Sequence, residues 1–88
     1  MNLLVIINPK GQDAELGIEI DRVMKKLNWI AIPGFAYTYT KEVKNQSIDY
    51  LTTVVQQEVA NATNQAEWSQ VKFLYTISTD RPQLETTR

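Results

Sequence analysis

The residues best suited to chemistry follow an apolar run at the start of the chain, in the stretch Asn8-Pro9-Lys10-Gly11. Backbone amides at the start of a helix can bind an anion, and a neighbouring lysine adds positive charge. Lys10 and Gly11 therefore form a candidate anion site. Proline and glycine are also ordinary turn residues, so we favour a plain strand-to-helix turn here.

The stretch LLVIINPKG resembles the start of lipid- and diacylglycerol-kinase-like domains, where a strand runs into Asn-Pro-Lys-Ser-Gly. The resemblance covers only this stretch. Those enzymes also carry a later Gly-Gly-Asp-Gly-Thr phosphate loop, and this chain has no such segment. It also lacks the Gly-Lys-Ser/Thr pattern of a Walker loop.

Most catalytic side chains are missing from the sequence, because it contains no cysteine and no histidine. This composition excludes disulfides, thiolate nucleophiles, Cys/His zinc sites and a Ser-His-Asp triad. The chain has nine basic and ten acidic residues, so it lacks the excess of positive charge typical of duplex-DNA binders. We expect no catalytic residue, no metal site and no cofactor.

Alternating aromatic residues form the second candidate site, in the stretch PGFAYTYT. Gly34, Phe35, Ala36 and Tyr37 resemble part of the aromatic motif of RNA-recognition-motif domains. That resemblance implies that Phe35, Tyr37 and Tyr39 stack single-stranded RNA bases on an open sheet face. Pro33, Thr40 and Val5 depart from the family pattern, so we favour a core or dimer-interface role for the same aromatics.

A third alternative is a metal-dependent RNase, because small nucleases of the Cas2 and VapD kind are expected to share this order of elements. Those enzymes typically end their first strand in an aspartate that binds the metal. Asn8 stands at that point here, and an amide is a poor substitute for a carboxylate on Mg²⁺. We therefore rank the nuclease below the other two functions.

The elements that would position these residues follow from the spacing of apolar positions. Residues 2–8 form a strand that is apolar on both faces, with Leu3, Val5 and Ile7 on one side and Leu4 and Ile6 on the other. A helix capped by Gln12 or Asp13 should run to about Leu27. Residues 28–32 and 35–43 should form a hairpin hinged at Pro33-Gly34, and the main alternative is a single long strand with a bulge at Gly34.

A second helix should begin near Asn45 or Ser47 and run to about Ala62, and residues 71–78 should form the last strand. The order is β-α-β-β-α-β, which predicts a ferredoxin-like α+β fold: a four-stranded antiparallel sheet with both helices on one face. Right-handed crossovers would place the first and third strands in the middle. We expect one domain over residues 1–78 and a polar, flexible tail over 79–88.

The second apolar face of the first strand needs a cover, since a large exposed apolar patch is costly. We expect a second copy of the chain to provide it, with Val5, Phe35, Tyr37 and Tyr39 at the sheet face or interface. No apolar run is long enough to span a membrane, and the start lacks a signal pattern, so we expect a cytoplasmic protein. The leading hypothesis is a small non-enzymatic regulatory domain that binds another protein as a homodimer.

Overall fold

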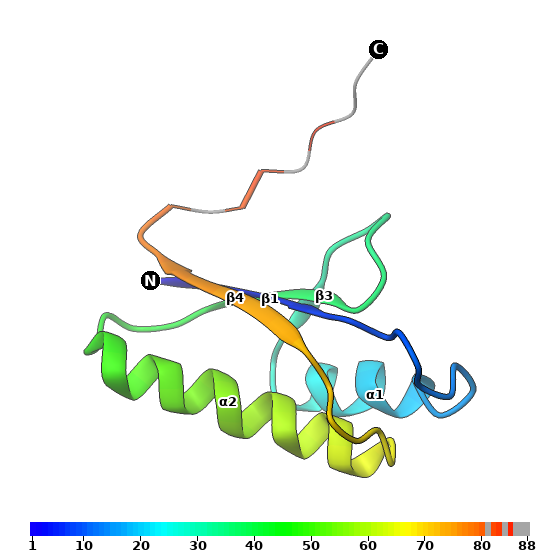
Figure 1. The fold of residues 1–88 in the computed structure, drawn as a ribbon. Helices are drawn as coiled ribbons and strands as arrows, with labels where there is room; N and C mark the ends of the chain where they lie inside the picture. Colours follow the sequence, from blue (N-terminus) through cyan, green and yellow to red (C-terminus); the bar gives the residue numbers. More distant parts are fainter. Residues whose placement is uncertain (81, 84, 86–88) are drawn as a thin grey trace.

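The computed structural model describes residues 1–80, 82, 83 and 85, and Figure 1 shows how their elements are arranged. The order is β1 (Asn2–Ile7), α1 (Ile18–Lys26), β2 (Ile30–Ala31), β3 (Thr38–Glu42), α2 (Ile48–Gln65) and β4 (Phe73–Ser78). The strands form one antiparallel sheet in the order β2-β3-β1-β4. The fold is therefore α+β, and the prediction that the first and third strands are central is confirmed.

Both helices lie against the same face of the sheet, and the core fills the space between them (Figure 1). Leu3, Val5 and Ile7 of β1 are fully buried there. The helices contribute the buried residues of their apolar stripes, namely Ile20, Val23, Met24, Leu51, Val55, Val59 and Ala62. Within each helix these residues recur at the three- and four-residue spacing of one helical face.

The first helix begins later than the sequence suggested. The predicted caps Gln12 and Asp13 instead belong to a run of turns, in which the Asp13 carboxylate accepts a hydrogen bond from the Glu15 amide at 2.9 Å. The helix begins after Gly17, which provides no side-chain cap. A short acceptor that bonds its own neighbouring backbone competes with the helix, so Asp13 stabilises a turn rather than a helix start. The second helix begins as predicted, with the Ser47 hydroxyl accepting from the Tyr50 amide.

Both helices end in the same way, with a left-handed residue followed by a buried tryptophan. Asn28 has φ 71° and Glu67 has φ 58°. The amides of Trp29 and Trp68 then bond back to the carbonyls of Met24 and Thr63, each at 2.9 Å. This six-to-one bond is the Schellman pattern, which satisfies carbonyls that the helix leaves free. Both tryptophans are packing residues of the core.

The hairpin between β2 and β3 is shorter than predicted, because the backbone leaves the ladder at Pro33. The amide of Phe35 bonds to the carbonyl of Ile32 at 3.2 Å, and Gly34 has φ 84°, as a type II turn requires. Tyr37 also has a left-handed φ of 50°. Phe35, Ala36 and Tyr37 therefore lie in a loop, and β3 begins only at Thr38.

Candidate functional site

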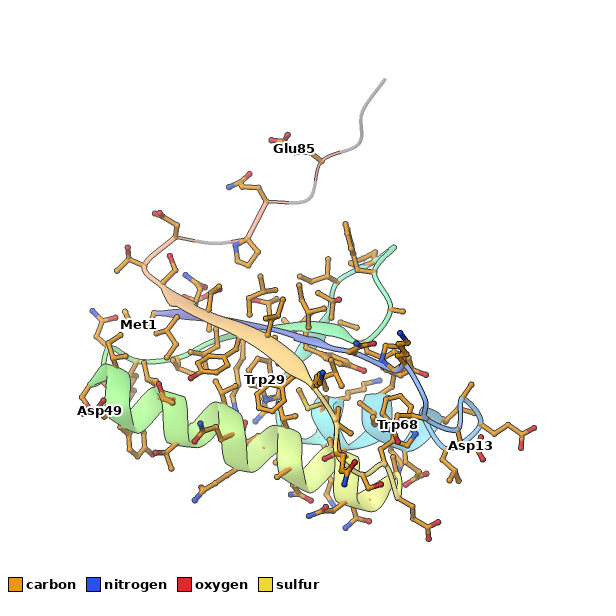
Figure 2. All side chains as sticks on the ribbon, viewed as in Figure 1. Met1, Asp13, Trp29, Asp49, Trp68 and Glu85 are labelled. Carbon is orange, nitrogen blue, oxygen red and sulfur yellow. The ribbon has the colours of Figure 1, made fainter. Side chains whose placement is uncertain are left out.

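A groove lies on the sheet face that the helices do not cover. Its volume is about 470 Å³. The lining residues come from the open sides of three strands, from the β2–β3 loop and from the segment after β4: Asn2, Leu4, Ile6, Ile30, Ala31, Ile32, Pro33, Phe35, Thr38, Thr40, Glu42, Pro82 and Gln83. In Figure 2 the side chains of this face stand on the side opposite the helices. We call this feature the open-face groove.

The strand register explains why these residues share one face. Leu4 lies between Thr40 of β3 and Thr76 of β4, and Ile6 lies between Thr38 and Leu74. Since side chains alternate along a strand, the even-numbered residues of β1 face away from the helices. Ile6 is 43% exposed and Leu74 is 73% exposed. The prediction that Leu4 and Ile6 form a second apolar face is confirmed.

The polar atoms of the groove are engaged locally. The Thr38 hydroxyl donates to the carbonyl of Ala36, and the Thr40 hydroxyl donates to the carbonyl of Leu3, both at 3.0 Å. Glu42 is the acidic side chain that lines the groove. The remaining lining is largely aliphatic, with Phe35 from the loop. Such a surface suits an apolar partner better than a charged substrate.

The four predicted binding residues do not share the open face. Val5 is 0% exposed and Tyr39 is 2% exposed, and both belong to the core beneath the helices. Phe35 lies in the loop and is exposed, whereas Tyr37 is half-buried. Placing all four at one surface was wrong, because the alternation that linked Phe35, Tyr37 and Tyr39 ends where the loop begins. The side-by-side aromatic platform that RNA stacking requires is therefore not formed by these residues.

Tyr37 belongs to a packing cluster beside the start of α1. Its ring lies edge-on to Trp68, with the ring centroids 5.1 Å apart. A Cβ atom added at Gly17 would fall on the Tyr37 hydroxyl and lie 3.0 Å from the Trp68 ring. Gly17 thus permits the close approach of the Tyr37 and Trp68 side chains.

Lys10 and Gly11 lie in a tight turn that is separate from the helix start. The Lys10 amide bonds to the Asn8 side chain at 3.0 Å, and the Gln12 amide bonds to the carbonyl of Pro9 at 3.0 Å. Gly11 has φ 80°, which explains the glycine. Because α1 begins only at Ile18, its free amides are not beside Lys10. The predicted anion site is thus not assembled as expected.

Sequence reasoning missed a group of polar contacts that join β3 to both helices. The carboxylate of Glu58 on α2 accepts from Lys41 Nζ and from Trp29 Nε1, both at 2.8 Å. The Tyr39 hydroxyl donates to the Asp21 carboxylate on α1. Burial, the hydrogen bond to Asp21 and the Asp21 charge together raise the pKa of Tyr39 above its ordinary value of 10. The signal available was alternation, since Tyr39 and Lys41 lie on the same side of β3 as the core.

Within the described residues, no group of three or more acidic residues is placed to hold a metal ion. Over the same part of the chain, no helix combines the length and apolar character needed to cross a membrane.

Comparison of the chain with protein-family models, with curated proteins and with solved structures finds no match.

Proposed function

We propose that this chain is a small non-enzymatic binding domain that acts through contact with another protein, as a regulator or inhibitor would, and that it works as a homodimer. The observation that carries the proposal is the open-face groove. Its apolar side chains are solvent-exposed, while its threonine hydroxyls donate to the backbone. Exposed apolar surface of this kind marks an interaction site more often than a catalytic one.

The shape of the groove indicates what the partner presents. The β2–β3 loop and Pro82 line the same groove as the sheet, so the surface is hollowed rather than flat. A second flat sheet would need to approach to about 10 Å over its whole area. A narrow apolar element, such as the apolar face of a helix or a loop with one aromatic residue, fits such a groove better.

The small size of the chain supports the proposed homodimer. A chain of 88 residues buries a limited core, and association adds buried apolar surface. The near-neutral charge also opposes association only weakly. The cytoplasmic location inferred from the sequence stays a prediction.

We also propose that the fold is ferredoxin-like. Three features support this: the order β-α-β-β-α-β, the central placement of β1 and β3, and two helices on one face of an antiparallel sheet.

The proposal is tested by selecting peptides from a random library against the immobilised protein and measuring their affinity for variants. We expect Ile6→Glu and Ile30→Glu to weaken binding of the selected peptides at least about tenfold, because each places a charge in the apolar groove. Ile18→Glu is the matched control, since Ile18 is 71% exposed on α1 and outside the groove. Selected peptides that are insensitive to Ile6→Glu would contradict the proposed binding surface.

The homodimer is tested separately by light scattering after size exclusion. We expect twice the mass of the chain at concentrations of about tens of micromolar, the range of a modest protein interface. A monomer under these conditions would contradict the homodimer.

A further inference from the structure

β4 is an edge strand of the sheet that the described residues form. All six of its residues pair with β1, from Ile7–Phe73 to Asn2–Ser78. The sheet order ends at β4, so no other described strand pairs with its second side. An edge of this kind presents unpaired N–H and C=O groups that can accept another strand.

The hydrogen-bond pattern identifies which residues face outward. The Asn8 amide bonds to the carbonyl of Lys72 at 2.9 Å, just before β4 begins. Because hydrogen-bonded pairs alternate along an antiparallel ladder, Leu74 and Thr76 also bond toward β1. The backbone groups of Phe73, Tyr75 and Ile77 therefore point away from the sheet.

β4 also lacks the features by which edge strands usually avoid pairing. Its sequence FLYTIS contains no charge and no proline. At the opposite edge of the sheet, β2 is only two residues long and offers little backbone. The two edges of the sheet thus differ in their capacity to accept a strand.

We infer that two copies of this chain join through their β4 edges, antiparallel about a twofold axis at Tyr75, to form one continuous sheet. In this register the three outward residues are all used: Tyr75 pairs with Tyr75 of the second copy, and Phe73 pairs with Ile77. Each of these pairs exchanges its outward N–H and C=O groups. The inference rests on the proposed homodimer and gives it an interface.

The charges that flank β4 favour a second copy in this orientation. Lys72 precedes the strand and Asp80 follows it. In the antiparallel register Lys72 lies opposite Ser78 of the second copy and diagonal to Asp80, at about 7–8 Å between backbones, which a lysine side chain can span. By symmetry this contact occurs twice. A parallel arrangement would instead place the two Lys72 side chains together.

The edge pairing keeps the open-face groove available. Because the twofold axis is perpendicular to the joined sheet, the helices of both copies lie on one side and both grooves lie on the other. Leu74 then lies opposite Thr76 of the second copy, at the junction of the two grooves. The proposed dimer therefore presents a doubled apolar surface to its protein partner.

The test compares Tyr75→Pro with Tyr75→Ala by light scattering across a dilution series. Proline removes the outward N–H and leaves the bonds between β4 and β1 in place, because those use the neighbouring residues. Alanine removes the same side chain and keeps the N–H. We expect Tyr75→Pro to raise the Kd of the dimer at least about tenfold over Tyr75→Ala, through the loss of both bonds at the axis.

Two further experiments complete the test: a reversal of the charges at Lys72 and Asp80, and hydrogen exchange of the backbone amides of β4. Lys72→Asp should weaken the dimer about two- to fivefold, and adding Asp80→Lys should restore it. In the parent protein, hydrogen exchange at Phe73, Tyr75 and Ile77 should be slow when the chain is dimeric and fast on dilution to monomer. This measurement decides the question even if Tyr75→Pro does not fold.

The outcomes separate the two proposals. A monomeric parent would overturn the homodimer and the edge pairing together. A dimer with rapidly exchanging Phe73, Tyr75 and Ile77 amides would overturn the edge pairing alone. A dimer that Ile6→Glu dissociates while Tyr75→Pro preserves it would place the second copy on the open face, as the sequence suggested, and would also overturn the edge pairing.

Discussion

β1 carries aliphatic side chains on both faces of the sheet, and the two faces differ in what covers them. On one side Leu3, Val5 and Ile7 lie beneath the helices and are at most 1% exposed. On the other side Leu4 is half-buried and Ile6 is 43% exposed. The residue types are nearly the same. The difference between a buried core face and an exposed apolar face is therefore set by the neighbouring elements and not by β1 itself.

The covered face is also the one with specific polar contacts. Glu58 joins β3 to α2, and Tyr39 joins β3 to Asp21 of α1. On the open face the threonine hydroxyls donate only to the backbone. We infer that the covered face fixes the fold and that the open face is left free for a partner.

The largest expected contrast comes from placing an aspartate on each face of β1. Val5→Asp buries an unpaired carboxylate and should cost about 4 kcal/mol or more, enough to unfold a domain of marginal stability. Ile6→Asp places the same side chain in solvent, and the free energy of unfolding should change by about 1 kcal/mol or less. Urea unfolding followed by circular dichroism measures both. Equal losses would contradict the distinction between the faces.

The next contrast removes a contact between the sheet and α2. Glu58→Ala leaves Lys41 Nζ and Trp29 Nε1 without their shared acceptor, and should reduce stability by about 2–4 kcal/mol. Glu58→Gln keeps an acceptor for Trp29 and should cost less. The exposed pair Arg22–Glu19 is the control, because Glu19→Ala should leave the urea midpoint unchanged. A Glu58→Ala variant as stable as the parent protein would show that the contact does not hold β3 to α2.

A smaller contrast tests the close approach at Gly17. Gly17→Ala should destabilise the chain by about 1–3 kcal/mol, since the new methyl group collides with the Tyr37 hydroxyl. Tyr37→Phe removes that hydroxyl and should restore part of the loss in the double variant. Gly11→Ala serves as a control, because its cost arises from a φ of 80° and Tyr37→Phe should not relieve it. Additive effects of Gly17→Ala and Tyr37→Phe would exclude the collision.

The smallest contrast appears only at high pH. The folded chain holds the Tyr39 proton more tightly than the unfolded chain, whose tyrosines titrate near pH 10. Above that pH the unfolded state binds fewer protons, so stability should fall as pH rises, by up to about 1.4 kcal/mol per unit from this group. Tyr39→Phe should reduce the slope of stability between about pH 9 and pH 11. An unchanged slope would show that Tyr39 does not contribute to it.

Much of the scaffold followed from the sequence, because its signals are local. The stripe Leu51, Val55 and Val59 with the cap Ser47 located α2 closely. The start of α1 was harder to predict from the sequence. Asp13 can cap a helix or stabilise a turn, and only the surrounding structure decides between these two roles.

The candidate site was harder to predict. Tyr39 belongs to the core and Phe35 to the loop, although both fit the same alternating pattern. The pattern holds only while the chain stays in one strand, and the left-handed Tyr37 interrupts it. The residues that do line the groove on β1 were identified, because Leu4 and Ile6 alternate with buried neighbours. The second apolar face was therefore a better guide than the aromatic motif.

The pairing of β1 with β4 has a consequence during synthesis. Ile7 is synthesised before its partner Phe73, which follows 66 positions later (73 − 7). At about 5–20 residues per second, β1 waits several seconds before its last neighbour exists. Throughout that interval Leu3, Val5 and Ile7 lack the completed sheet that buries them. We therefore expect slower translation between α2 and β4 to increase aggregation of the nascent chain.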